Sequence, residues 1–212
     1  MVFSSTVFLF AFLPVTVIGY YILPRFLRNI FLFLVSIAFY AYGEPKFVLV
    51  LLLSIGVNYV FGLLVDRFRE KKLLARLILL LMLVFNFSFL VVCKYMNFIT
   101  GNLQKVLGDS VTVTDIALPI GISFFTFQAV SYVLDIYRQH GEVQKNPLNV
   151  GLYISFFPQL IAGPIVRYET VAKEIRKRYF SFSEVSIGVK RFLMGLGKKV
   201  LLANSMAVVA DY

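Results

Sequence analysis

The side chains with the clearest capacity for chemistry lie in an otherwise apolar stretch of the sequence. Gln128, Ser131, Tyr132 and Asp135 recur there at intervals of three or four residues, which places them on one face of a helix. Polar groups that face lipid are costly, so this face is expected to contact protein or water. Two interpretations follow. The stripe either hydrogen-bonds to neighbouring helices, with Asp135 paired to Arg138 one turn later, or lines a cavity that holds a substrate.

A second apolar stretch carries Gln159 and Arg167 as its polar members. Pro158, Gly163 and Pro164 deny it a regular helix. One interpretation is a kinked membrane span whose arginine reaches the headgroup layer. The other is a functional element that enters the membrane and leaves on the same side. The density of proline and glycine favours the second interpretation.

No catalytic or metal-binding constellation is apparent among these residues. His140 is the sole histidine, and it lies in a polar turn without a partner for acid–base work. The segment Gly195–Lys199 lacks the Ser or Thr that follows Gly-Lys in a phosphate-binding loop. We therefore predict no catalytic residue, no metal ligand and no bound cofactor in this chain.

The composition indicates a membrane protein. Of the 212 residues, 59% are hydrophobic and only 15% are charged, against about 25% in a typical soluble domain. The net charge of +10 could suggest nucleic acid, but the basic residues form short clusters between apolar runs. Such clusters are typical of loops that face an anionic cytoplasmic leaflet. We therefore expect a lipid bilayer as partner, and no nucleic acid.

Apolar runs long enough to enter a bilayer recur along the chain. A polar stretch, 97–115, predicts a loop between two of them. The last run has basic residues on one half of a helix and could also lie in the headgroup layer. The predicted segments are 7–23, 29–42, 47–65, 77–93, 116–136, 148–166 and 188–210.

The basic loops do not fit seven simple crossings. If residues 25–28 and 67–76 are cytoplasmic, successive crossings leave the basic cluster 173–178 on the wrong side. The simplest solution is that 116–136 or 148–166 enters the membrane without crossing it; a non-crossing 29–42 segment is the alternative. Pro119 and Gly121 interrupt the 116–136 segment, and Pro158 and Pro164 interrupt the 148–166 segment. Irregular backbone at membrane depth must be buried in protein or line a wet cavity. The predicted fold is all-α, a polytopic helical membrane protein of roughly six to seven segments, at least one re-entrant or broken, around a funnel or tunnel.

The motifs resemble those of the membrane-bound O-acyltransferases, in the bacterial branch that contains alginate O-acetylation and teichoic-acid D-alanyl transfer proteins. The resemblance runs along the whole chain and is closer to the alginate-acetylation type. It is carried by residues 1–10, 39–42, 94–95, 118–138, 160–167 and 191–200.

This resemblance implies a ring of helices around a passage through a bacterial plasma membrane, with several crossings. It implies transfer of an acyl group, acetyl rather than D-alanyl, to hydroxyls of an exported or cell-surface polysaccharide such as alginate. The donor would be an acyl carrier or be derived from acetyl-CoA. The implied partners are the bilayer, the polysaccharide acceptor, an acyl-donor carrier protein and extracytoplasmic acetylation proteins.

The hallmark catalytic histidine of the family belongs to a later helix than any in this sequence, and His140 does not match it. We therefore expect residues 1–212 to form the amino-terminal portion of a single acyltransferase domain, inactive alone. Gln128, Tyr132 and Asp135 would shape one tunnel wall, and Gln159 and Arg167 the other. Two alternatives are a non-catalytic, transporter-like or export-partner module and a remnant without function.

Overall fold

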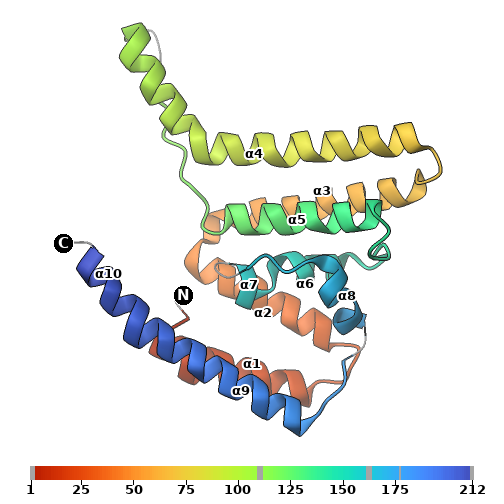
Figure 1. Ribbon diagram of the computed structural model, residues 1–212, viewed down its shortest axis with the longest axis vertical. Coiled ribbons are helices and arrows are strands. Elements are labelled where there is room, and N and C mark those ends of the chain that lie inside the picture. The colour runs from red at the N-terminus through yellow and green to blue at the C-terminus, as the bar shows by residue number, and fades with distance from the viewer. Residues whose placement is uncertain (1–2, 109–111, 161–163, 177, 211–212) are drawn as a thin grey trace. The chain divides into compact units, whose positions relative to one another are not determined.

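The computed structural model describes residues 3–108, 112–160, 164–176 and 178–210 (Figure 1). These residues form helices and connecting segments without a strand. They belong to two units: a larger one, Pro24–Ile175, and a smaller one that combines Met1–Leu23 with Arg176–Tyr212. Each unit is described by itself below.

Within the larger unit, α5 is the central helix. It packs against α3, α4 and α6, and α2 packs against α6 and α7. Figure 1 shows α4 in one layer, α3 and α5 in the next, and α2, α6 and α7 beyond them. The bounds are α2 (Arg28–Gly43), the 3₁₀ turn η2 (Pro45–Phe47), α3 (Val48–Arg67), α4 (Lys72–Leu107), α5 (Ile122–Tyr137), α6 (Pro147–Ser155), α7 (Phe157–Leu160) and α8 (Tyr168–Arg176).

The core of this unit surrounds α5. Phe125, Ala129, Val133 and Ile136 are fully buried and lie three or four residues apart, on one face of the helix. Val130 on the opposite side is also buried, at 6% exposure. An apolar helix that is buried on more than one side requires neighbours on more than one side, which is the position that α5 occupies between two layers.

Two helices in the described part of the chain are long and apolar enough to cross a membrane, Pro45–Arg67 and Lys72–Leu107. Both helices leave large apolar side chains exposed, including Leu49 at 76% and Leu81 at 61%. Shorter apolar helices lie at Phe8–Ile22, Arg28–Gly43 and Ile122–Tyr137. The all-helical prediction is confirmed, and the sequence positions of these helices agree with five of the seven predicted segments.

The prediction of a loop over residues 97–115 was wrong in its first part. Helix α4 continues to Leu107, because its polar residues are satisfied along the helix itself. The Thr100 hydroxyl donates to the Met96 carbonyl (2.9 Å), and the Asn102 amide donates to the Phe98 carbonyl (2.9 Å). Such bonds to the carbonyl one turn earlier allow polar residues inside a helix and are associated with bending. Figure 1 shows α4 bending along its length.

The chain that returns from α4 to α5 is irregular and is fastened to α4. The Asn97 carboxamide donates to the Ile116 carbonyl (2.8 Å) and accepts from the Ile116 N–H (2.9 Å). The Thr114 N–H donates to the Thr100 hydroxyl (3.2 Å). These bonds satisfy backbone groups that have no helical partner. Helix α5 therefore starts at Ile122, six residues later than its predicted segment.

Pro119 and Gly121 form the turn at which α5 begins. The Pro119 carbonyl accepts from the Ile122 N–H (3.2 Å), and Gly121 adopts a positive φ of 77° at the N-cap. That conformation favours glycine. The predicted interruption in segment 116–136 thus lies before the helix and not within it.

In the smaller unit, residues 178–180 contact the end of the amino-terminal helix. The Arg178 guanidinium donates to the Tyr20 hydroxyl (3.4 Å), and the Tyr21 and Phe180 rings pack edge to face. The segment predicted over 188–210 is helical but starts earlier, and the described side chains of α9 are mainly exposed. The bounds are the π-helix η1 (Phe8–Phe12), α1 (Leu13–Ile22), α9 (Phe182–Gly197), the π-helix η4 (Lys198–Ala203) and α10 (Asn204–Ala210).

Candidate functional site

The segment predicted over 148–166, in which proline and glycine were expected to prevent a regular helix, is broken between α6 and α7. Protein groups satisfy the freed backbone. The Phe157 N–H, which would continue the helix by bonding to Tyr153, donates instead to the Ser36 hydroxyl of α2 (3.3 Å). The Gln159 amide donates to the Tyr153 carbonyl at 2.6 Å. Pro158 has no backbone N–H, so this residue needs no hydrogen-bond acceptor. An irregular backbone can persist away from water only with such partners.

Both ends of this broken segment lie at the same end of the helical unit. At its start, Asn149 on α6 accepts a hydrogen bond from Asn29 at the start of α2 (3.0 Å). The same Asn29 amide donates to the Ile175 carbonyl of α8 (2.9 Å). Figure 1 shows the chain leaving along α6 and coming back to α8 after α7. The segment therefore turns back on itself rather than running through the unit.

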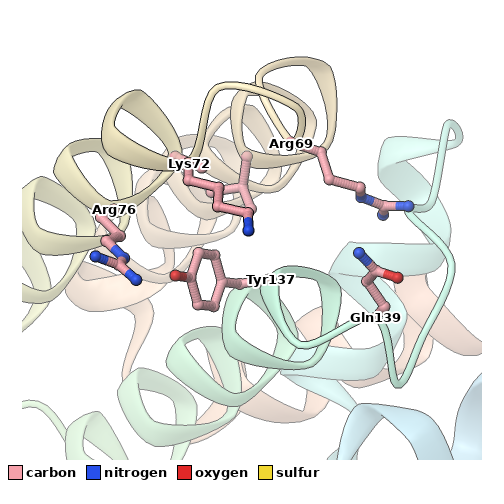
Figure 2. Close-up of a pocket in the computed structure, with 7 residues that line it drawn as sticks. Arg69, Lys72, Arg76, Tyr137 and Gln139 are labelled. Atoms are coloured by element: carbon pink, nitrogen blue, oxygen red, sulfur yellow. The ribbon is translucent and has the colours of Figure 1, made fainter.

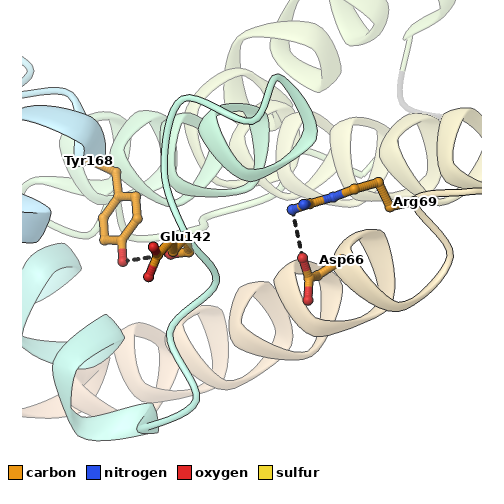
Figure 3. Close-up of polar contacts among 4 residues, drawn as sticks. All are labelled: Asp66, Arg69, Glu142 and Tyr168. Carbon is orange, nitrogen blue, oxygen red and sulfur yellow. Dashed lines mark hydrogen bonds and ion pairs between the residues drawn. The ribbon is translucent and has the colours of Figure 1, made fainter.

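The returning chain is fixed by tyrosines. The Tyr153 hydroxyl donates to the Val166 carbonyl (2.7 Å), and the Tyr168 hydroxyl donates to the Glu142 carbonyl (3.1 Å; Figure 3). The Tyr168 ring packs edge to face on both Tyr132 (4.9 Å between centroids) and Tyr153 (5.3 Å). Gly141 permits this packing, since a Cβ there would lie 2.9 Å from the Tyr168 ring. The tyrosine cluster joins α5, α6 and α8.

Asp135 is buried at 5% exposure and connects the end of α5 to the start of α8. Its carboxylate accepts a hydrogen bond from the Glu169 N–H in the first turn of α8 (3.2 Å). A negative charge at this position is favourable because first-turn N–H groups are unsatisfied and the helix dipole is positive there. The predicted ion pair with Arg138 is not found among the described residues. An exposed arginine cannot compete with a buried N–H that faces the carboxylate.

Of the rest of the polar stripe on α5, Gln128 and Tyr132 are also buried and Ser131 is half-buried. Gln128 is 1% exposed and Tyr132 is fully buried. Gly62 of α3 allows Tyr132 to approach, since a Cβ at this glycine would lie 2.7 Å from Cε1 of the ring. The Gln128 Oε1 and the Thr126 hydroxyl have no hydrogen-bond partner in the structure. The stripe thus faces protein, and its contact with a substrate stays a prediction.

In the described part of the chain, no hydrogen bond or ion pair joins Gln128, Tyr132 or Asp135 directly to Gln159 or Arg167. Gln159 is half-buried and bonds within the break, whereas Arg167 is exposed. Pro164 lies in an irregular run, and Gly163 falls outside the described residues. The tunnel contacts of Gln159 and Arg167 therefore stay predictions.

A buried amide pair between α3 and α4 was missed by sequence reasoning. Asn58 and Asn86 exchange hydrogen bonds of 3.0 and 2.9 Å, and each also donates to the carbonyl four residues earlier. Both are nearly inaccessible, at 0% and 2% exposure. The available signal was an asparagine in the middle of each of two neighbouring apolar runs. Amide pairs of this kind hold membrane helices together.

His140 lies in the turn after α5, where its side chain is half exposed and its Nδ1 is 3.9 Å from Glu169 Oε2. Its N–H donates to the Asp135 carbonyl (2.9 Å) as part of the helix end. No group of three or more His, Cys, Asp or Glu residues that could hold a metal occurs in the described ranges. The position of His140 gives it a structural role at the helix terminus.

A pocket lies away from the broken segment, between the α3–α4 turn and the end of α5. It has a volume of about 300 Å³ and contains none of the predicted tunnel residues. Its polar lining is basic: Arg69, Lys72 and Arg76 face Tyr137 and Gln139 (Figure 2). In the sequence, these cations indicated only that the loop between α3 and α4 faces the cytoplasm.

Known proteins resemble this chain along its entire length. Alginate O-acetylases of Pseudomonas syringae pv. tomato and Pseudomonas aeruginosa, both designated probable, are 36% identical over 219 residues, and each alignment covers all of this chain and 42% of the relative. A peptidoglycan O-acetyltransferase of Helicobacter pylori is 33% identical over 244 residues, covering all of this chain and 46% of the relative. The chain spans less than half the length of these curated relatives. No family model and no solved structure matches it.

Proposed function

We propose, from the premise that this chain belongs to the membrane-bound O-acyltransferase family, that it is part of an enzyme that transfers acetyl groups to hydroxyls of an exported or cell-surface polysaccharide. The relatives named above are designated for two different polymers, alginate and peptidoglycan. What the two designations share is the transfer of an acetyl group to oxygen. The shared chemistry supports acetyl rather than D-alanyl transfer, with alginate as one candidate acceptor.

The observation that carries this proposal, beside the relatives, is the broken segment between Pro147 and Tyr168. Helix α6 has nine residues, which at about 1.5 Å per residue give about 14 Å, roughly half of a hydrocarbon layer about 30 Å thick. We propose that α6 and α7 enter the membrane from the cytoplasmic side and return to it. This arrangement would place the cluster Lys173–Arg178 in the cytoplasm with the other basic loops, and would remove the parity conflict in the sequence.

On this topology α2, α3, α4 and α5 are the crossing helices of the larger unit, in a multi-pass protein of the bacterial plasma membrane. Protein groups, not lipid, satisfy the broken backbone between them. Such irregular elements in membrane proteins border cavities through which substrates pass. We assign the wall of such a passage to Gln128, Tyr132, Asp135, Gln159 and Arg167.

In an acetyl transfer of this kind the acceptor hydroxyl must lose a proton as its oxygen attacks the acyl carbonyl carbon. His140 is half exposed at a helix end beside Glu169, so we do not assign this step to it. The chain would supply the scaffold and the passage, and the proton acceptor would lie outside residues 1–212. We expect the acetyl donor to be an acyl carrier or to be derived from acetyl-CoA.

The experiment deletes the gene that encodes this sequence in its own bacterium and measures ester-linked acetate released from surface polysaccharide by mild alkali. We expect the acetate content to fall, and to recover when the intact gene is restored. Unchanged acetate would refute the proposed function. Restoring only codons 1–212, followed by a stop codon, should leave acetate at the deletion level; recovery would show that these residues suffice.

A further inference from the structure

The basic pocket at the α3–α4 turn is a site that acyl transfer does not explain. Its floor is apolar, formed by Val65 and Ala75, each 2% exposed. Figure 2 shows the Arg76 guanidinium and the Lys72 ammonium directed toward Tyr137, with Arg69 opposite Gln139. The cationic side chains of Arg69, Lys72 and Arg76 on one wall of the pocket therefore face the Tyr137 hydroxyl and the Gln139 amide on the other wall.

The cations in this pocket are only partly neutralised by the protein. Arg69 pairs with Asp66 at 2.6 Å (Figure 3). In the described part of the chain, neither Lys72 nor Arg76 forms an ion pair within 4.0 Å. A pocket with uncompensated positive charge attracts an anion.

The same charges oppose the structure of α4. This helix starts at Lys72, has no acidic residue in its first turn, and receives no side-chain hydrogen bond from its N-cap, Lys71. Cations at a helix N-terminus are unfavourable, and like charges four residues apart, such as Lys72 and Arg76, repel each other. An anion held between them would remove both penalties and would also accept from free first-turn N–H groups.

Gln139, on the pocket wall, closes the end of α5 in a left-handed conformation. Helix α5 ends with bonds from the His140 N–H to the Asp135 carbonyl (2.9 Å) and from the Gln139 N–H to the Ile136 carbonyl (3.1 Å). In this type of helix end, the residue at Gln139 has a positive φ, here 62°, and is usually glycine. A glutamine costs backbone strain there, and its amide lies on the pocket wall.

We propose that this pocket binds a phosphate group. Arginine forks and a lysine point charge are the side chains that phosphate oxygens prefer, and hydroxyl and amide donors complete such sites. The phosphate could belong to an anionic phospholipid headgroup or to a soluble molecule. The lipid source is favoured because Leu73 and Leu77, beside the two cations on α4, are 74% and 49% exposed and offer a surface to acyl chains.

The test measures the unfolding temperature of the complete protein in a neutral detergent. Phosphatidylglycerol, phosphatidylcholine and inorganic phosphate are titrated separately. If the source is a lipid headgroup, phosphatidylglycerol raises the unfolding temperature and the other two do not. If the source is soluble, inorganic phosphate raises it and the two lipids behave alike. If no probe stabilises the chain, the proposal is wrong.

The variant Lys72→Gln/Arg76→Gln should bind the stabilising probe about tenfold more weakly, because two charge-assisted contacts are lost. Its unfolding temperature without ligand should be unchanged or higher, since the repulsion at the start of α4 is relieved. A residue pair with a purely structural role would show the opposite shift. The control Lys190→Gln/Arg191→Gln removes the same two charge types from exposed positions on α9 and should keep its affinity within about twofold.

Gln139→Gly decides the question if the double variant does not fold. Glycine suits the left-handed position, so this variant should be at least as stable as the wild type and bind the probe about fivefold more weakly. Equal loss of affinity in the pocket and control double variants, or full affinity in Gln139→Gly, would overturn the proposal. None of these outcomes depends on acetyl transfer, so the two proposals fail separately.

Discussion

Asp135 at the end of α5 accepts a hydrogen bond of 3.2 Å from the N–H of Glu169 at the start of α8. This bond closes the broken segment, because it joins the chain just before α6 to the chain just after α7. The tyrosine cluster packs beside it. The buried Asp135 carboxylate thus has a hydrogen-bond partner, the Glu169 N–H, that is too distant in the sequence for a local pattern to reveal.

Replacement of Asp135 by leucine should destabilise the protein by about 1–2 kcal/mol, because the first turn of α8 loses its acceptor. Asp135→Asn retains a carbonyl oxygen at nearly the same place and should lose less than half as much. The measurement is the unfolding temperature in detergent.

Polysaccharide acetylation by the Asp135→Leu protein, expressed in its complete form, should fall by more than its abundance does if Asp135 also borders the substrate passage. Unchanged activity and abundance would remove Asp135 from both roles. Glu169→Gln is the matched control, since the N–H that donates to Asp135 is unaffected.

Gly62 and Gly56 form a matched pair on α3. A Cβ at Gly62 would lie 2.7 Å from the Tyr132 ring, whereas a Cβ at Gly56 meets nothing within 4 Å. We expect Gly62→Ala to cost about 1–3 kcal/mol through overpacking against a ring that has little room to move. Gly56→Ala should be neutral or stabilise by up to about 1 kcal/mol, through its higher helix propensity. Equal stability of the two variants would contradict the packing of α3 on α5.

The amide pair of Asn58 and Asn86 should show a measurable coupling energy. Each single leucine variant leaves the other amide without its partner, and should cost about 1 kcal/mol. The double variant should cost less than the sum of the singles, with a coupling of about 0.6–1.7 kcal/mol. The measurement is thermal unfolding of the wild type, the two single variants and the double variant, which together form a double-mutant cycle. Additive costs would mean that the two amides do not interact.

The topology can be tested by labelling single cysteines in a Cys93→Ser background, since Cys93 is the free thiol of the chain. Lys145→Cys and Lys173→Cys flank the broken segment and should react with an impermeant maleimide from the cytoplasmic side. Lys46→Cys, between α2 and α3, should react from the other side.

Labelling of Lys173→Cys from the same side as Lys46→Cys would show that the segment between α6 and α8 crosses the membrane. That result would refute the re-entrant proposal and leave the family assignment intact. Denatured membranes serve as the control for reactivity, because all three cysteines should then be labelled.

Apolar runs predicted the cores of α2, α3 and α4 well, since a helix in an apolar environment must satisfy its own backbone. The pattern failed at residues 97–107. Polarity there suggested a loop, but Asn97 and Thr100 are needed to hold the returning chain at Ile116 and Thr114. Contacts between distant segments are invisible to local composition.

The same limit applied to the candidate site. The prolines at 158 and 164 lie in the stretch where the helix is interrupted, but nothing local revealed that Ser36 and Gln159 satisfy the break. The spacing of Lys72 and Arg76 did offer a signal, because cations are unusual at a helix start. The left-handed backbone of Gln139 offered none.

The length of α4 has a consequence for how other proteins can approach this one. Its 36 residues measure about 54 Å along the bent helix axis, whereas about 20 residues cross a hydrocarbon layer of about 30 Å. On the proposed topology the surplus turns, with Asn102 and Lys105, lie on the extracytoplasmic side. A water-soluble protein would reach these turns without entering lipid, and Asn97 and Thr100 link them to the chain that leads into α5.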